Sequence, residues 1–272
     1  MRPARAPSRS RRPRRFGPGL ALLALAVFGT VPGAHADDDA GTEAPVVVVT
    51  WRTGLDYSQG DYGLKEDSRL IYVPLGVTVD VDYWRFGITL PLLHSDGVVG
   101  FTGGGGLGPL LPERGEKTGL GETITSASYL FPPAAEGLPW IEVTGQVSWP
   151  TRTADVLGTG DFAFAGQVDV FKPIGDWTPF ARFGRNFFVV GSLDDRFYAS
   201  VGATYAWSER VSTGLAYDWL GRAVSGVNHG HELVPYASVA IDESWRFGPY
   251  AVVGLSSGSP DYGLGLSVSF TP

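Results

Sequence analysis

Apolar and polar side chains alternate along much of the chain with a period of two residues. In the clearest run, residues 46–57, one face would carry Val47, Val49, Trp51, Thr53, Leu55 and Tyr57, and the other Thr50, Arg52, Gly54 and Asp56. A helix would repeat every 3.6 residues, so this pattern predicts a β-strand with one apolar face.

Twelve such runs follow one another, and most have the roughly 9 to 11 residues that a tilted strand needs to cross a membrane. The first run ends at about 57, the second ends at about 79, and the third begins at 84. The other nine cover about 121–131, 139–150, 160–171, 177–188, 196–207, 210–221, 231–241, 245–255 and 261–270. Short turns (80–82, 132–137, 173–176, 208–209, 242–244) alternate with longer loops (58–69, 94–119, 153–158, 190–195, 222–230, 256–260).

An even strand number with alternating long and short connections is typical of outer-membrane barrels. We therefore predict an all-β fold, a transmembrane antiparallel up-and-down β-barrel of about twelve strands. The short turns and both termini would then face the periplasm, and the long loops the outside. A soluble β-sandwich would also explain the alternation, but not the tryptophan positions described next.

Five of the eight tryptophans lie within about three residues of a short turn: Trp84, Trp140, Trp177, Trp207 and Trp245. Tryptophan gathers at membrane interfaces, so these positions indicate an aromatic belt. Trp140 has the wrong parity, because it points inward if Ile141 and Val143 point outward. Arg185 falls on an outward face, and we expect it near the external rim, since a charge at mid-bilayer would cost about 2–4 kcal/mol.

The first 36 residues resemble a secretory signal peptide. Seven arginines precede an apolar stretch at 20–27, and Ala34, His35 and Ala36 form a small-residue cleavage site. We expect a mature barrel covering 37–272, with an acidic leader at 37–44. A membrane anchor is the alternative, but the apolar stretch is shorter than the roughly 20 residues that a spanning helix needs.

Charge and composition exclude several function classes. Removal of the signal peptide leaves 14 basic residues of the 21 against 28 acidic ones, a net charge of −14. No nucleic-acid partner is expected, because phosphate binding needs a basic face. The chain has no cysteine, which excludes disulfides and thiolate chemistry.

Six short segments carry a family resemblance. They are residues 72–75 (YVPL), 89–91 (TLP), 158–161 (GTGD), 177–180 (WTPF), 231–236 (HELVPY) and 258–263 (GSPDYG). Their order resembles the outer-membrane barrel transporters grouped with the MetA-pathway phenol-degradation proteins. The resemblance implies a barrel that admits small, aromatic or hydrophobic compounds. The last strand also resembles an outer-membrane assembly signal, although Thr271 and Pro272 follow its final aromatic residue.

Polar side chains fall on the faces that would point into the barrel, where lipid exposure is avoided. The predicted pore-lining residues are Arg52, Asp56, Arg85, Glu142, Gln146, Gln167, Asp169, Arg182, Asn186, Asp218, Glu232 and Arg246. Such a mixture of charges suits a pore that orients a polar solute. It also suits a closed interior of ion pairs, because twelve strands lie between filled and open barrels.

An enzyme or a metal protein has little support in the sequence. Lipid-hydrolysing barrels need a histidine and a serine two residues apart on one face, whereas His94 and Ser95 are neighbours that would point oppositely. His229 and His231 share a strand face without a third ligand. The glycine run at 103–108 precedes no helix and so is no phosphate cradle; we expect the 94–119 loop to be external and to influence selectivity.

We therefore predict a passive outer-membrane channel of a Gram-negative bacterium, with no cofactor, metal or catalytic residue. Its partners would be the lipid bilayer, the outer-membrane assembly machinery and a small-molecule solute. A barrel with a structural or surface-interaction role is the alternative, and an outer-membrane lipid hydrolase is a more distant one.

Overall fold

The computed structural model describes residues 46–64, 66–97, 99–102, 106–109, 115–135, 137–189, 194–222 and 227–272. The predicted signal peptide (1–36), the acidic leader (37–44) and parts of the 94–119 loop lie outside these ranges. Within the described ranges, no helix is long and apolar enough to cross a membrane.

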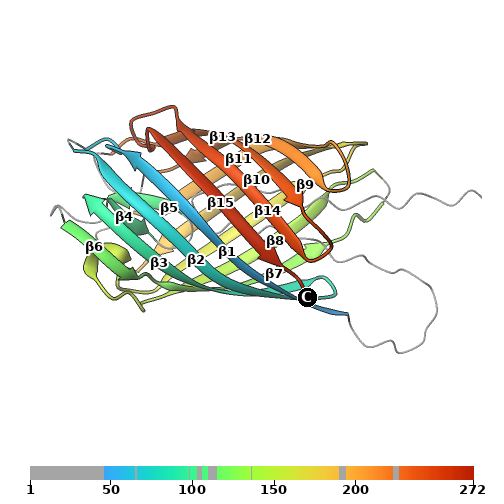
Figure 1. Ribbon diagram of the computed structural model, residues 1–272, viewed down its shortest axis with the longest axis horizontal. Coiled ribbons are helices and arrows are strands. Elements are labelled where there is room, and N and C mark those ends of the chain that lie inside the picture. Colours follow the sequence, from blue (N-terminus) through green and yellow to red (C-terminus); the bar gives the residue numbers. More distant parts are fainter. Residues whose placement is uncertain are drawn as a thin grey trace, which may run out of the picture.

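The chain folds into a closed antiparallel β-barrel of twelve strands (Figure 1). The wall consists of β1 (Val47–Gly60), β2 (Ser68–Val81), β3 (Trp84–Gly97), β6 (Gly115–Leu120) with β7 (Thr123–Phe131), β8 (Trp140–Trp149), β9 (Ala163–Phe171), β10 (Trp177–Phe188), β11 (Arg196–Ala206), β12 (Val211–Leu220), β13 (Gly230–Ala240), β14 (Trp245–Gly254) and β15 (Tyr262–Phe270). β6 and β7 form one interrupted strand, because both pair with β3. Pairing of β1 with both β2 and β15 closes the ring.

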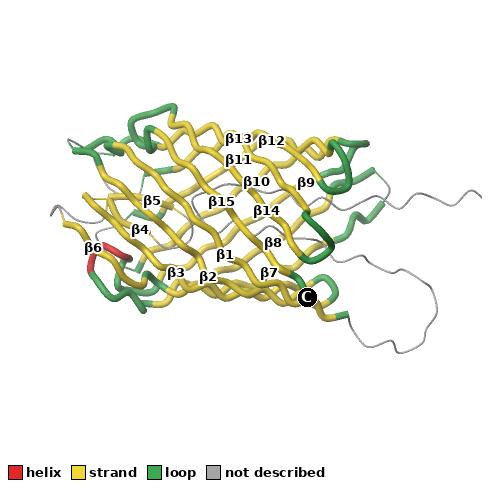
Figure 2. The backbone as a smooth tube through the Cα atoms, viewed as in Figure 1, coloured by secondary structure: helices red, strands yellow, loops and turns green. Residues whose placement is uncertain are grey.

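The two ends of the barrel differ in their connections. The described chain begins at the end where the C-terminus lies, and five short turns join strands there (Figure 1). We call this the turn end and the opposite end the loop end. The loop end carries a small hairpin of β4 (Val99–Thr102) and β5 (Gly106–Pro109) and the short 3₁₀ helix η1 (Asp155–Leu157), drawn red in Figure 2.

The wall has an apolar outer face and a polar inner face. Outward side chains such as Trp51, Ile88 and Leu264 are more than half exposed, whereas inward ones such as Asp56 and Arg85 are buried. A soluble protein has the opposite arrangement, with charges exposed and large apolar side chains covered. The polarity therefore matches a wall whose outer face contacts lipid.

A belt of outward aromatic rings surrounds the turn end. Trp84 lies 4.8 Å from the ring of Tyr129, and Trp245 lies 4.7 Å from Phe270, measured between ring centroids. Trp177 and Trp207 both contact Tyr205. Tightly spaced aromatic side chains at one height are what an interfacial belt requires.

Trp140 is excluded from this belt, as its parity predicts. It lies on the inner face, half-buried and stacked on Phe171 at 6.5 Å. Arg185 also lies where expected, facing outward near the loop end, where it forms an ion pair with Asp195 at 2.7 Å. Its guanidinium covers the rings of Phe187 and Phe197, which shields the outward charge.

Several predicted boundaries are wrong, among them the end of the first strand, which continues to Gly60, and the start of β9 at Ala163. The turn assigned to 80–82 starts later, because β2 continues to Val81 and the turn consists of Asp82 and Tyr83. Asp82 has φ +51°, the left-handed conformation that aspartate tolerates in tight turns. The predicted loop 94–119 is also partly strand, since β3 extends to Gly97 and pairs with β6.

Candidate functional site

The inner wall carries two buried ion pairs between neighbouring strands. Arg85 Nε donates to Asp80 Oδ1 at 2.5 Å, linking β3 to β2. Arg182 Nε donates to Asp169 Oδ1 at 2.6 Å, linking β10 to β9. Gln167 donates to the other oxygen of Asp169 at 2.5 Å. In each pair the two residues are direct cross-strand partners, so the register of the barrel brings opposite charges together.

Other inward carboxylates lack a close cation. Within the described residues, no basic nitrogen lies within 4.0 Å of Asp56, Glu142, Asp218 or Glu232. Asp218 and Glu232 are direct partners on β12 and β13, and Glu142 is the partner of Asp169. The inner face from β8 to β13 therefore carries more acidic than basic side chains.

All twelve predicted pore-lining residues lie on the inner face. Each of these residues alternates along its strand with outward neighbours and pairs with an inward residue of the adjoining strand. For example, the cross-strand partners of Arg52, Glu142 and Gln146 are Gly76, Asp169 and Ser126. Arg246 lies near the turn end and donates to Ser238 at 3.0 Å. The structure thus brings the predicted residues onto one surface but spreads them along its height.

Inspection of the sequence missed four inward residues of this surface. The sequence predicts a turn at Asp80, although the alternation from Thr78 places it inside. Arg196 begins β11 and is buried on the inner face. Glu122 falls in the predicted strand 121–131, where the alternation from Ile124 and Ser126 would also have placed it inside. Leu157 belongs to a connection, where no periodic signal exists.

Aromatic rings on the inner wall lie over glycines of the next strand. The cross-strand partners of this kind are Tyr198 with Gly184, Phe180 with Gly202, Tyr236 with Gly214 and Tyr250 with Gly265. A Cβ atom added to any of these glycines would overlap the facing ring. The glycines therefore leave the space at the wall that the rings occupy.

Two apolar clusters lie inside the barrel. The larger cluster contains Leu130, Phe171, Phe180, Ala216, Val234, Tyr236 and Val252, with Tyr83, Trp140 and Tyr250 against it. The loop-end cluster contains Leu70, Tyr72, Leu93, Ile124 and Leu157. Apolar side chains therefore lie beside charged ones on the inner wall, since Leu130 is the cross-strand partner of Glu142 and Tyr72 that of Asp56.

Residues 150–162, which we call the strap, enter the barrel at the loop end. Leu157, the last residue of η1, is fully buried against inward residues of β2, β3 and β7. Complete burial of a leucine side chain contributes about 1.5–3 kcal/mol. Figure 2 shows η1 beside β6 at that end.

Glu122 anchors the strap from the gap between β6 and β7. Its Oε1 accepts hydrogen bonds from Thr159 Oγ1 at 2.7 Å and from Gly160 N at 2.6 Å. Burial raises the pKa of Glu122, while these hydrogen bonds and the charge of Arg152 oppose the increase. Arg152 in turn donates to the carbonyl oxygens of Asp155 and Gly158 at 2.6 and 2.5 Å, which fixes the shape of the strap.

Three histidines of the described ranges lie at the loop end: His94, His229 and His231. His94 faces outward and shares a hydrogen bond with Thr118 at 2.7 Å, whereas Ser95 is buried on the opposite face. His231 contacts the hydroxyl of Tyr217 at 2.6 Å, and His229 lies beside Trp219. Among the described residues, no three His, Asp or Glu side chains are grouped to hold a metal ion.

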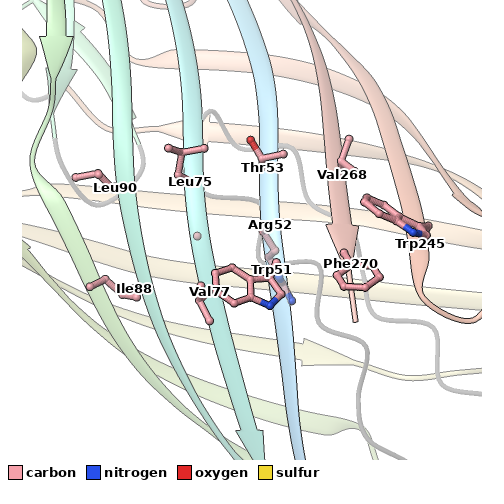
Figure 3. Close-up of a pocket in the computed structure, with 11 residues that line it drawn as sticks. Trp51, Arg52, Thr53, Leu75, Val77, Ile88, Leu90, Trp245, Val268 and Phe270 are labelled. Carbon is pink, nitrogen blue, oxygen red and sulfur yellow. The ribbon is translucent and has the colours of Figure 1, made fainter. Parts of the chain in front are cut away.

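An apolar groove of about 590 Å³ lies on the outer face, separate from the interior (Figure 3). Its lining comes from β1, β2, β3, β14 and β15, and includes Trp51, Thr53, Leu75, Val77, Ile88, Leu90, Trp245, Val268 and Phe270. These side chains belong to the outward rows, so the groove is part of the surface that would face lipid.

Comparison with solved structures supports the barrel fold. No protein-family model matches the chain, and no curated protein matches it. Among solved structures, an outer membrane channel of Pseudomonas putida F1 matches with a TM-score of 0.62 and 14% identity, covering 87% of this chain and 100% of that one. The KdgM porin in complex with oligogalacturonate (TM-score 0.47, 9% identity, 83% and 98% covered) and the P. putida toluene transporter TodX (0.44, 10%, 82% and 89%) are more distant. The chain therefore shares the barrel fold of an outer-membrane channel.

Proposed function

We propose that this protein is an outer-membrane channel through which small solutes diffuse passively. The observation that carries the proposal is the inverted polarity of the closed barrel, with charged side chains such as Arg85, Asp169 and Asp218 inside and apolar ones outside. A wall of this kind is stable in lipid and offers a polar route through it. The predicted pore-lining residues would border that route.

The orientation follows from the connections. Short turns of outer-membrane barrels face the periplasm, so the turn end with its aromatic belt would be periplasmic and the strap external. Cleavage after Ala36 would release a mature chain of 37–272 from the secretory route in a Gram-negative cell. The outward row of β15, which ends in Phe270, would be read by the outer-membrane assembly machinery.

The chemistry of the inner wall favours solutes that combine an apolar body with a polar group. The two apolar clusters would contact a ring or hydrocarbon, and the charged residues beside them would orient a polar substituent. The resemblance to the MetA-pathway phenol-degradation group points the same way, since it implies small aromatic or hydrophobic compounds. We therefore place small aromatic solutes first among candidates.

A barrel without transport is the second candidate, with a structural or surface role. The ion pairs of Asp80 with Arg85 and of Asp169 with Arg182, together with the inserted strap, favour it, because they fill part of the interior. A lipid hydrolase is more distant, since His94 and Ser95 lie on opposite faces of β3.

Current through a planar bilayer separates these functions. The refolded protein should conduct ions, and aromatic solutes should cross proteoliposomes that contain it. A protein that shows the heat-dependent gel mobility of a folded barrel, but carries neither current nor solute, would exclude the channel. A lipid-hydrolysis assay on the same sample tests the remaining class.

A further inference from the structure

We propose that Leu157, carried into the barrel on the strap, limits the opening of the external mouth, and that Glu122 is the positioning residue that holds it there. The inference rests on the proposed channel function and adds the element that selects solutes by size. It assigns this role to residues 150–162, whereas the sequence suggested the 94–119 loop, of which residues 98, 103–105 and 110–114 lie outside the described ranges.

The position of Leu157 places it inside the mouth. The strap connects β8 to β9, yet η1 lies against β6 and β3, and Leu157 belongs to one buried cluster with Leu93 of β3 and Leu70 and Tyr72 of β2. The interrupted strand β6–β7 lies between β8 and β3 in the wall. The strap therefore runs inside that strand towards β3, and the side chain of Leu157 lies in the space that an entering solute would use.

The wall beneath the strap is shaped to receive it. A Cβ atom on Gly119 would overlap the hydroxyl of Thr153 and lie 3.1 Å from Leu157 Cδ1. A Cβ on Gly121 would lie 2.6 Å from Leu93 Cδ1 and 3.1 Å from the Leu157 carbonyl oxygen. The absence of side chains at these two inner positions leaves the room that the strap fills.

The strap is held by contacts that can break without opening the barrel. Thr153 exchanges two hydrogen bonds of 2.9 Å with Leu120, and Glu122 accepts two from Thr159 and Gly160. None of these bonds belongs to a pairing between wall strands. Departure of the strap would widen the mouth while the strand ladders stay intact, which is the usual behaviour of a locally opening segment. The GTGD segment of the family resemblance, residues 158–161, is the part that binds Glu122.

Two substitutions test this role in different ways. Gly119→Ala should displace the strap by overlap, and Leu157→Ala should keep it docked but remove the side chain from the opening. Gly145→Ala is the matched control, because a Cβ there meets nothing within 4 Å. Heat-dependent gel mobility checks that each variant still forms the barrel.

Thiol labelling gives a readout that does not depend on conduction. The chain has no cysteine, so Ser126→Cys introduces a single reporter on the inner face of β7, two residues from Ile124 towards the turn end. With a membrane-impermeant maleimide added at the loop end, Gly119→Ala and Leu157→Ala should raise the labelling rate roughly threefold or more, since access no longer waits for local opening. The control should label at the wild-type rate.

The outcomes separate the inference from the function. Faster labelling with higher single-channel conductance supports both. Faster labelling in a protein that never conducts supports the strap assignment and rejects the channel. Unchanged labelling in both variants, with intact barrels, overturns the assignment whatever the conductance. Glu122→Gln, which keeps an acceptor oxygen, should label slowly, and Glu122→Ala should label fast; equal rates would show that Glu122 does not position the strap.

Discussion

The two ends of the barrel interior are built by different means. At the turn end, rings such as Phe180 and Tyr250 lie over glycines that are their cross-strand partners, so strand register sets their position. At the loop end, Leu157 arrives on a connecting segment and joins a buried cluster with side chains of β2, β3 and β7. The interior of the turn end is therefore as rigid as the wall, whereas at the loop end the strap can move while the pairing of the wall strands stays intact.

The difference indicates where control of passage lies. A ring fixed by direct cross-strand pairing moves only if the ladder breaks, at the cost of its hydrogen bonds. The strap is held by a few hydrogen bonds of Thr153 and Glu122 in addition to the burial of Leu157. Such bonds contribute about 0.5–1.5 kcal/mol each and up to about 3 kcal/mol where one partner is charged. The loop end is thus the adjustable end.

The largest expected effect concerns the charged wall between the two ends. Arg182→Ala would leave Asp169 buried without its ion-pair partner, which costs about 3–5 kcal/mol for a buried pair. Equilibrium unfolding in urea with lipid should show this loss, and reversal potentials should shift towards cation preference. Arg246→Ala at the turn end, where the side chain donates to Ser238, should lower the free energy of unfolding far less. Equal decreases for the two variants would mean that the Arg182–Asp169 ion pair adds no particular stability.

A second prediction tests the rigid end. Gly214→Ala would overlap the ring of Tyr236 and either strain the wall or push the ring into the interior. Overpacking of this kind costs about 1–3 kcal/mol, so we expect a lower unfolding midpoint and a reduced conductance. Gly166→Ala, where a Cβ meets nothing within 4 Å, is the control. Indistinguishable midpoints for the two variants would refute the ring-on-glycine account.

The smallest expected effect is a pH dependence of the loop end. Burial raises the pKa of Glu122 above its ordinary 4.5, so the docked strap binds this proton more tightly than a released one would. Docking of the strap is then strongest at pH values below 4.5 and weakens as the pH rises through the raised pKa of Glu122. Among the charged groups described, Arg152 opposes the shift without reversing it.

This pH dependence is measurable with the Ser126→Cys reporter. Labelling from the loop end should accelerate as pH rises above 4.5, after correction for the intrinsic reactivity of the thiol. In Glu122→Gln the corrected rate should be flat. A slope that persists in the glutamine variant would assign the effect to another group.

Much of the wall could be predicted from the sequence, because alternation reports directly which side chains face lipid. The strand at Trp177–Phe188 has the predicted bounds, and the outward Arg185 and inward Trp140 follow from parity alone. Asp80 was missed because aspartate is also a turn residue, and composition outweighed alternation there. Leu157 lies in a connection without a period, and the hydrogen bonds that Glu122 accepts join residues more than 30 positions apart, which alternation does not report.

The contrast between the ends is tested most directly by labelling one reporter from both sides of a membrane. With the Ser126→Cys protein inserted in one orientation, an impermeant maleimide should react faster from the turn end than from the loop end. The difference should vanish when Leu157→Ala is combined with the reporter. Equal labelling rates from both ends in the parent protein would contradict the account, because the strap would then not limit access to the interior from the loop end.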